Sequence, residues 1–210
     1  MFEIAAVTYG HGEKLKCFIN SIKAQSSDKW NLHIVHDGKG EDFYKLKEEL
    51  ESNGYLNDKI VLSASEERYN DYGHSLRSHC LKNPICESAY TILTNGDNYY
   101  PPVWIETLSH WIEKCAKEKV SPDIIFWDLI SHHSYMNCNF DRNHPYGVLS
   151  TQFREASIDM GSVAIKTKVA QKVGFNSRGF AADWHYFSEC YKSLEKPTVL
   201  KIPQVLLVHN

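Results

Sequence analysis

Short apolar runs alternate with amphipathic segments through the first half of the chain, and this alternation constrains the fold more than any other feature of the sequence. The runs are short and partly β-branched, as in FEIAAVTY, which favours buried strands. The expected elements alternate strand and helix, beginning and ending with a strand: 2–9, 13–25, 30–36, 41–52, 59–63, 73–81 and 88–94. This order predicts a parallel sheet with helices packed on it.

The second half continues the pattern less regularly. Pro101 and Pro102 are expected to open a helix that runs to about residue 119, since proline is tolerated in a first helical turn. A strand, a polar loop, a second strand, two helices and a last strand are expected to follow: 123–129, 131–146, 158–165, 167–173, 181–194 and 204–209. No repeat or clear linker divides the 210 residues, so we expect one α/β domain with two functional halves, 1–100 and 101–210.

Composition excludes several classes of protein. The formal net charge of −3 comes without a basic stripe, so nucleic acid is not an expected partner. No apolar run approaches the ~20 residues of a membrane-spanning helix, and the N-terminus does not resemble a secretory signal. We therefore expect a cytoplasmic protein without a transmembrane segment. The six cysteines include no C-x-x-C pair, which argues against a zinc site and favours reduced thiols.

The segment TILTNGDNYYPP, residues 91–102, carries the most chemical information. An apolar strand runs directly into Asn95, Gly96 and Asp97, so a carboxylate is expected at the end of the sheet where ligands of parallel sheets bind. Asp97 could hold Mg²⁺ or Mn²⁺, hard ions that bridge diphosphate oxygens with few protein ligands. The alternative is that these residues only form a tight turn. Thr8, Tyr9 and Asp37 follow neighbouring strands and are expected at the same edge.

Four segments, taken in order, resemble the GT-A glycosyltransferases of the family 2 type, and the resemblance extends over nearly all of the chain. They are VTYGHGEKLKCFINSIKAQ, WNLHIVHDG, LTNGDNYYPP, and DMGSVAIKTKVAQKVGF followed by ADWHYF. The resemblance implies a GT-A-type, Rossmann-like mixed sheet flanked by helices. It also implies a nucleotide-sugar donor, with a UDP-linked sugar as one candidate, and a carbohydrate or lipid-linked acceptor.

The same resemblance assigns donor-binding roles. Val7, Thr8 and Tyr9 would line the base and ribose pocket, and Asp37 would accept a hydrogen bond from the base. A strand-end turn at Asp37 is the alternative. Arg77 would lie near the diphosphate, although a lone arginine on a helix is more often solvated or salt-bridged.

Metal and catalytic roles are also implied. Asn95 would contact the ribose, Asp97 would hold Mn²⁺ or Mg²⁺ against the diphosphate, and His209 would add a metal ligand unless it is only a frayed strand end. Asp183 would be the base that deprotonates the acceptor hydroxyl in an inverting, single-displacement reaction. The alternative for Asp183 is a helix cap.

The sequence departs from the family pattern at two places. Asn95, Gly96 and Asp97 stand where the family usually has two or three acids, and Ala182 replaces an acid before Asp183. These departures keep open a non-catalytic nucleotide- or sugar-binding module on the same fold. The motif Gln-x-x-Arg-Trp of processive membrane synthases does not occur.

Two other enzyme classes share the strand and helix alternation. A dinucleotide-binding oxidoreductase of the NAD type needs G-x-G-x-x-G, and no third glycine follows Gly10 and Gly12. A nucleotidyltransferase would need a glycine-rich loop with Arg and Lys, which YGHGEKLK matches poorly. The His132–His133 pair is interpreted as surface or loop residues. The loop 131–146 is expected to shape the acceptor site because it is rich in His, Asn and Tyr.

Overall fold

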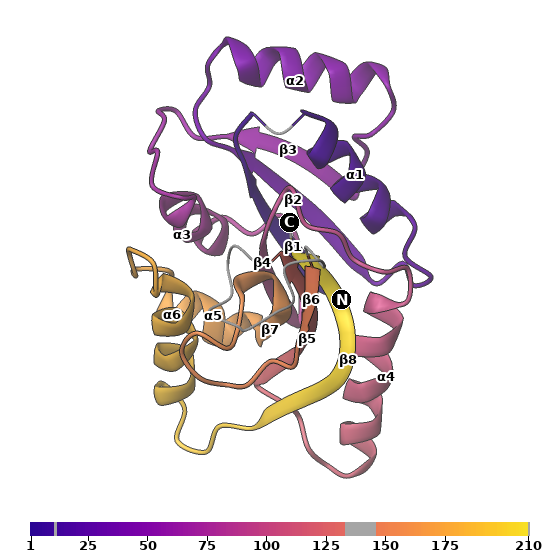
Figure 1. The fold of residues 1–210 in the computed structure, drawn as a ribbon, viewed down its shortest axis with the longest axis vertical. Coiled ribbons are helices and arrows are strands. Elements are labelled where there is room, and N and C mark those ends of the chain that lie inside the picture. Colours follow the sequence, from indigo (N-terminus) through magenta and orange to yellow (C-terminus); the bar gives the residue numbers. More distant parts are fainter. Residues whose placement is uncertain (11, 133–145, 210) are drawn as a thin grey trace.

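An eight-stranded mixed sheet runs through the chain (Figure 1). The computed structural model describes residues 1–10, 12–132 and 146–209. Its first elements are β1 (Phe2–Thr8), α1 (Gly12–Lys23), β2 (Trp30–His36), α2 (Glu41–Ser52), β3 (Ile60–Ala64), α3 (His74–Lys82) and β4 (Tyr90–Asn95). The later ones are α4 (Trp104–Lys117), β5 (Ile124–His132), β6 (Tyr146–Leu149), the 3₁₀ turn η2 (Met160–Ser162), β7 (Val163–Lys166), α5 (Thr167–Val173), α6 (Ala182–Lys192) and β8 (Val199–His209).

The strand order is β3-β2-β1-β4-β7-β5-β6, and β8 pairs with β5. Strands β1, β2, β3 and β4 run parallel to one another, whereas β7 is antiparallel to both β4 and β5. This arrangement confirms the prediction of a single α/β domain with a mixed sheet. The antiparallel strand β7 distinguishes this fold from that of a dinucleotide-binding oxidoreductase, whose sheet is parallel.

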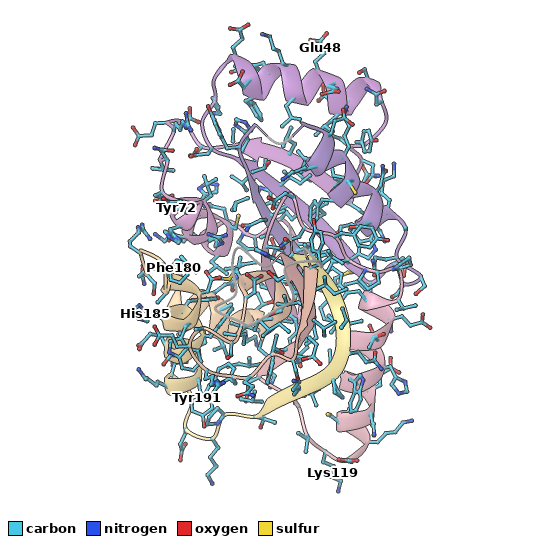
Figure 2. The ribbon with its side chains drawn as sticks, in the orientation of Figure 1. Glu48, Tyr72, Lys119, Phe180, His185 and Tyr191 are labelled. Carbon is cyan, nitrogen blue, oxygen red and sulfur yellow. The ribbon has the colours of Figure 1, made fainter. Side chains whose placement is uncertain are left out.

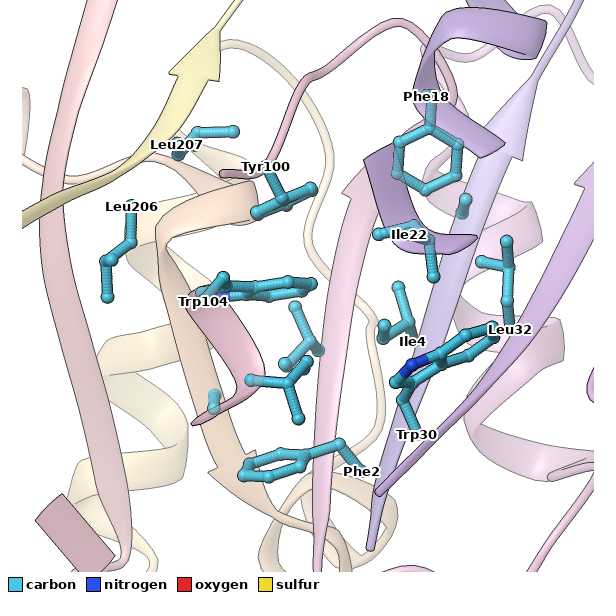
Figure 3. Close-up of a cluster of buried hydrophobic side chains, with 14 of the residues drawn as sticks. Phe2, Ile4, Phe18, Ile22, Trp30, Leu32, Tyr100, Trp104, Leu206 and Leu207 are labelled. Atoms are coloured by element: carbon cyan, nitrogen blue, oxygen red, sulfur yellow. The ribbon is translucent and has the colours of Figure 1, made fainter. Parts of the chain in front are cut away.

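Two apolar cores lie on opposite faces of the sheet, because successive side chains of a buried strand point to opposite sides. On β1, Ile4 and Ala6 pack into the first core and Ala5 and Val7 into the second. The first core is covered by α1, α2 and α4, and the second by α3, α5 and α6. Figure 3 shows the first core, where the ring of Tyr100 stacks on Trp104 at 3.8 Å between centroids.

The prediction of a strand over 158–165 was wrong for its first half. Asp159 accepts a hydrogen bond from the backbone N–H of Gly161, and the Ser162 hydroxyl lies 3.2 Å from the backbone nitrogen of Asp159. These side-chain contacts satisfy backbone groups in a turn and so compete with strand pairing. Only Val163–Lys166 forms a strand, β7.

Three further boundaries differ from expectation. Strand β6 was not predicted, because its four residues give too short an apolar pattern. Strand β8 begins at Val199 rather than at residue 204, and an irregular register opposite Asp128 accommodates Pro203. Helix α4 begins at Trp104, so both prolines precede it. No helix of the described residues is long and apolar enough to cross a membrane.

Candidate functional site

The carboxyl ends of three parallel strands form one edge of the sheet. The register pairs Thr8 of β1 with His36 of β2, and Val7 of β1 with Asn95 of β4. The residues that follow these strands therefore emerge together, as the sequence predicted for Tyr9, Asp37 and Asp97. In parallel α/β sheets this is the edge where ligands bind.

Asp37 anchors the β3–α3 loop, residues 65–73. Its two carboxylate oxygens accept hydrogen bonds from the backbone N–H groups of Tyr69 (2.8 Å) and Asn70 (2.9 Å). The carboxylate is nearly buried, and the chain turns beside it at Gly38, whose φ is +96°. Asp37 thus occupies the predicted strand-end turn. It also holds the β3–α3 loop in place, a role that the sequence did not predict.

A cavity of about 330 Å³ opens beside Asp37 and is bordered by Tyr9. The guanidinium of Arg68 lies 3.6 Å from the centre of the Tyr9 ring and covers one of its faces. Val7 and Thr8 are buried in the protein instead, with Gly73 packed close to Val7. Of the three residues predicted to line a base and ribose pocket, Tyr9 borders this cavity.

Arg77 is buried, which excludes the alternative of a solvated arginine. Only 4% of its surface is exposed. One amino group donates to Oδ1 of Asn95 at 2.6 Å, and the other donates to the carbonyl of Tyr72 at 2.9 Å. Arg77 therefore connects the end of β4 to the β3–α3 loop, and its charge lies at the strand edge.

The residues Asn95, Gly96 and Asp97 form the predicted turn. A Cβ on Gly96 would lie 2.9 Å from Leu15 and 3.2 Å from Thr8, so the turn packs closely against α1 and β1. The Oδ1 atom of Asn95 is engaged by Arg77. Among the described residues, no hydrogen bond or ion pair engages the half-buried carboxylate of Asp97, which leaves its oxygens available to a ligand.

Asp183 lies in the first turn of α6 but does not cap that helix. The capping position is Ala181, which makes no side-chain cap, so the helix-cap alternative is wrong. Instead, Oδ2 of Asp183 accepts a hydrogen bond from the backbone N–H of Met160 at 3.1 Å. Burial and the neighbouring Asp159 raise the pKa of Asp183 to about 6, against the opposing effect of the Arg77 charge. A carboxylate with such a pKa is suited to accept a proton near neutral pH.

Asp159 is a site residue that the sequence reasoning missed. It adjoins Met160, the residue that binds Asp183, and its own Oδ1 accepts from the N–H of Gly161 at 2.8 Å. Both acids therefore hold the same turn, η2. The signal in the sequence was the spacing of Asp159 and Ser162, which is typical of a capping turn.

A buried polar network fixes η2 against β4. The Tyr100 hydroxyl donates to the carbonyl of Gly161 at 2.9 Å and lies 2.7 Å from the Thr94 hydroxyl. Asn98 donates to the same Thr94 hydroxyl at 3.0 Å. A Cβ on Gly161 would lie 2.8 Å from Nδ2 of Asn98, so a larger residue does not fit without a shift. This packing sets the position of Asp159 relative to the end of β4.

His209 ends β8 and pairs with Ser131 of β5, so it is not a frayed terminus. Its Nε2 lies 3.6 Å from Oδ2 of Asp159. Tyr99 and Val208 exchange backbone hydrogen bonds of 3.0 and 2.8 Å, which brings the turn containing Asp97 close to the end of β8. The two predicted metal ligands, Asp97 and His209, are therefore on adjacent chain segments.

Asp97 and His209 do not by themselves complete a metal site. Among residues 1–10, 12–132 and 146–209, no group of three or more His, Cys, Asp or Glu side chains could hold a metal ion. A carboxylate without a partner among the described residues, and an imidazole on the adjacent segment, would fit a divalent ion that takes its other ligands from diphosphate and water. Of the remaining predictions, His133 and most of the loop 131–146 lie outside the described residues.

Comparison of the sequence with protein-family models and with curated proteins finds no match. Among solved structures, S. aureus TarS 1-349 in complex with UDP-GlcNAc is similar with a TM-score of 0.71 and 14% identity, over 99% of this chain and 58% of that chain. A longer S. aureus TarS structure gives 0.71 and 15% identity, over 100% of this chain and 36% of that one.

A second kind of glycosyltransferase has the same architecture. The mannosyltransferase PcManGT from Pyrobaculum calidifontis, in complex with GDP-Man and Mn²⁺, gives a TM-score of 0.67 and 12% identity, over 99% of this chain and 56% of that chain. The chain thus spans less than two thirds of the length of these structures. At such low sequence identities, the structural similarity establishes the fold of this chain but not its substrates. The chain therefore has the GT-A glycosyltransferase fold, as the resemblance of its sequence implied.

Proposed function

We propose that the chain transfers a sugar from a nucleotide-diphosphate sugar to an acceptor hydroxyl, with inversion at the anomeric carbon. The observation that carries the proposal is Asp183, a largely buried carboxylate whose pKa is raised to about 6 at the strand edge. The similar structures hold UDP, UDP-GlcNAc or GDP-Man, which supports a nucleotide-sugar donor.

Residues 1–100 would bind the donor. In this proposal the base enters the cavity beside Asp37 and packs on Tyr9, and the Val7–Thr8 backbone borders the ribose. Asn95 and Arg77 lie further along the same edge, hydrogen-bonded to each other. The charge of Arg77 would offset the negative charge that develops on the diphosphate as it leaves.

Asp97 and His209 would hold Mn²⁺ or Mg²⁺ when donor is bound. The Mn²⁺ of the mannosyltransferase complex supports a divalent ion, and so does the Asp97 carboxylate, which has no hydrogen-bond or ion-pair partner in the described part of the chain. A bound ion would stabilise negative charge on the diphosphate oxygens.

Residues 101–210 would bind the acceptor and supply the base. An alcohol is a poor nucleophile at neutral pH, so Asp183 would take its proton as the hydroxyl oxygen bonds to the anomeric carbon and the bond to the diphosphate breaks. Asp159 carries a second negative charge near Asp183, which raises the affinity of Asp183 for that proton.

Calorimetry with UDP-, GDP-, CDP- and dTDP-sugars, with and without Mn²⁺, followed by an assay of donor hydrolysis, tests the proposal. One donor should bind and be hydrolysed, and Asp183→Asn should bind it without turnover. Asp58→Asn is the matched control, since Asp58 is exposed and precedes β3 at the opposite edge. Binding without hydrolysis by the native chain would indicate a non-catalytic module, and preferential binding of NAD would indicate an oxidoreductase.

A further inference from the structure

Two aromatic side chains protrude from the molecule beside the site. Tyr72 is 90% exposed and Phe180 is fully exposed, although exposed apolar surface is unfavourable in water. Tyr72 precedes α3 and Phe180 precedes α6, and Figure 2 shows both on the same side of the molecule. Neither ring is buried in a core of the described residues.

The loops that carry the two rings are joined to each other. Arg178 reaches from the α5–α6 loop, residues 174–181, to the β3–α3 loop. Its Nε lies 3.8 Å from Oδ2 of Asp71, and its Nη2 lies 3.3 Å from the Ser75 hydroxyl. Beneath this contact the rings of His74 and Phe175 stack with centroids 5.6 Å apart. Tyr72 and Phe180 are therefore within two residues of one shared contact.

The backbone positions of both residues are tied to proposed site residues. The carbonyl of Tyr72 is fixed by Arg77, and Phe180 is three residues before Asp183. Tyr72 adopts a φ of +59°, a left-handed conformation that is rare for an aromatic residue. Strained backbone of this kind is characteristic of functional sites, where surrounding contacts maintain it.

We propose that Tyr72 and Phe180 form an aromatic binding site for the sugar ring of a carbohydrate acceptor. This inference rests on the proposed function and names the acceptor class. The axial C–H groups of a pyranose form an apolar face that packs on aromatic rings, while its hydroxyls need polar partners. Asn70 and Asn176 are exposed on the same two loops and supply such partners.

A lipid surface fits these loops less well. Membrane-binding surfaces combine apolar side chains with basic ones. Arg178, two residues before Phe180, is already paired with Asp71, and Arg68 of the β3–α3 loop packs on the ring of Tyr9. On α6, the exposed Glu189 is paired with Lys192. These basic side chains are thus engaged within the protein, which suits an uncharged sugar better than an anionic membrane.

The test measures sugar binding by saturation-transfer NMR on the UDP-loaded chain, with cellobiose, chitobiose, mannobiose and galactobiose as probes. At least one probe should bind, and Tyr72→Ala and Phe180→Ala should each raise its Kd about tenfold, which corresponds to a loss of about 1.4 kcal/mol for the ring contact. Phe180→Trp should retain binding. Tyr191→Ala, at the far end of α6, is the control and should bind like the native chain.

Donor affinity and donor hydrolysis should be unchanged in Tyr72→Ala and Phe180→Ala, which separates this inference from the proposed function. If the native chain binds a probe through these rings but hydrolyses no donor, the transferase proposal fails and the sugar site stands. Equal probe binding by the alanine variants, or no binding of any probe, would overturn the inference. Phe180-dependent sedimentation with phosphatidylglycerol vesicles, without sugar binding, would also overturn it and assign the rings to a membrane.

Discussion

Replacing Asp183 by Asn should make the protein more stable while it abolishes transfer. Burial and Asp159 raise the pKa of this carboxyl from its ordinary 3.8 to about 6, so the folded state holds the proton more tightly than the unfolded state. Native stability is therefore lost as pH rises from about 4 to about 6. The loss amounts to about 3 kcal/mol above pH 6, because a tenfold change in an equilibrium constant corresponds to about 1.4 kcal/mol.

Asn removes this ionisation but retains a carbonyl oxygen that can accept the hydrogen bond from Met160. Urea unfolding should show Asp183→Asn to be about 3 kcal/mol more stable at pH 8, with the difference shrinking towards zero near pH 4. Transfer by the native chain should rise with pH through about 6. A stability difference that does not depend on pH, or a variant less stable than the native chain at pH 8, would refute the reasoning.

Three further substitutions test the parts of the site separately. Gly161→Ala should lower the free energy of unfolding by about 1–3 kcal/mol, since overpacking costs about that much; an unchanged Tm would contradict the packing against Asn98. Asp37→Asn should lower both the Tm and the donor affinity, because an amide NH₂ cannot accept a backbone hydrogen bond; calorimetry showing native affinity would exclude a donor role. Asp97→Ala should leave the Tm nearly unchanged but remove any effect of Mn²⁺ on donor affinity, and a retained Mn²⁺ effect would place the ion elsewhere.

Local sequence patterns were sufficient to predict the first half of the fold. Each strand there is followed by a helix with a regular apolar face, so the alternation alone indicates a parallel sheet. Chain order then places Asp37 and Asp97 at one edge, because the carboxyl ends of parallel strands coincide. These predictions depend only on short-range patterns, and the structure confirms the placement.

Contacts between distant segments could not be predicted in this way. Nothing near Asp37 in the sequence indicates that its carboxylate holds Tyr69 and Asn70, which are 32 and 33 residues away. The hydrogen bond between Arg77 and Asn95 spans 18 residues and depends on how α3 packs on the sheet. Asp159 was overlooked for a different reason. The apolar residues after it favoured a strand, so the capping pattern of Asp159 and Ser162 was not interpreted as a turn.

If the strand edge from Asp37 to Asp183 binds a nucleotide sugar, a crystal structure with the tightest-binding donor from the calorimetric panel should show the donor there. We expect the base beside Asp37 and Tyr9, the diphosphate beside Asp97, and the anomeric carbon on the side of Asp183. A donor bound on another face of the molecule, or with its sugar directed away from Asp183, would contradict it.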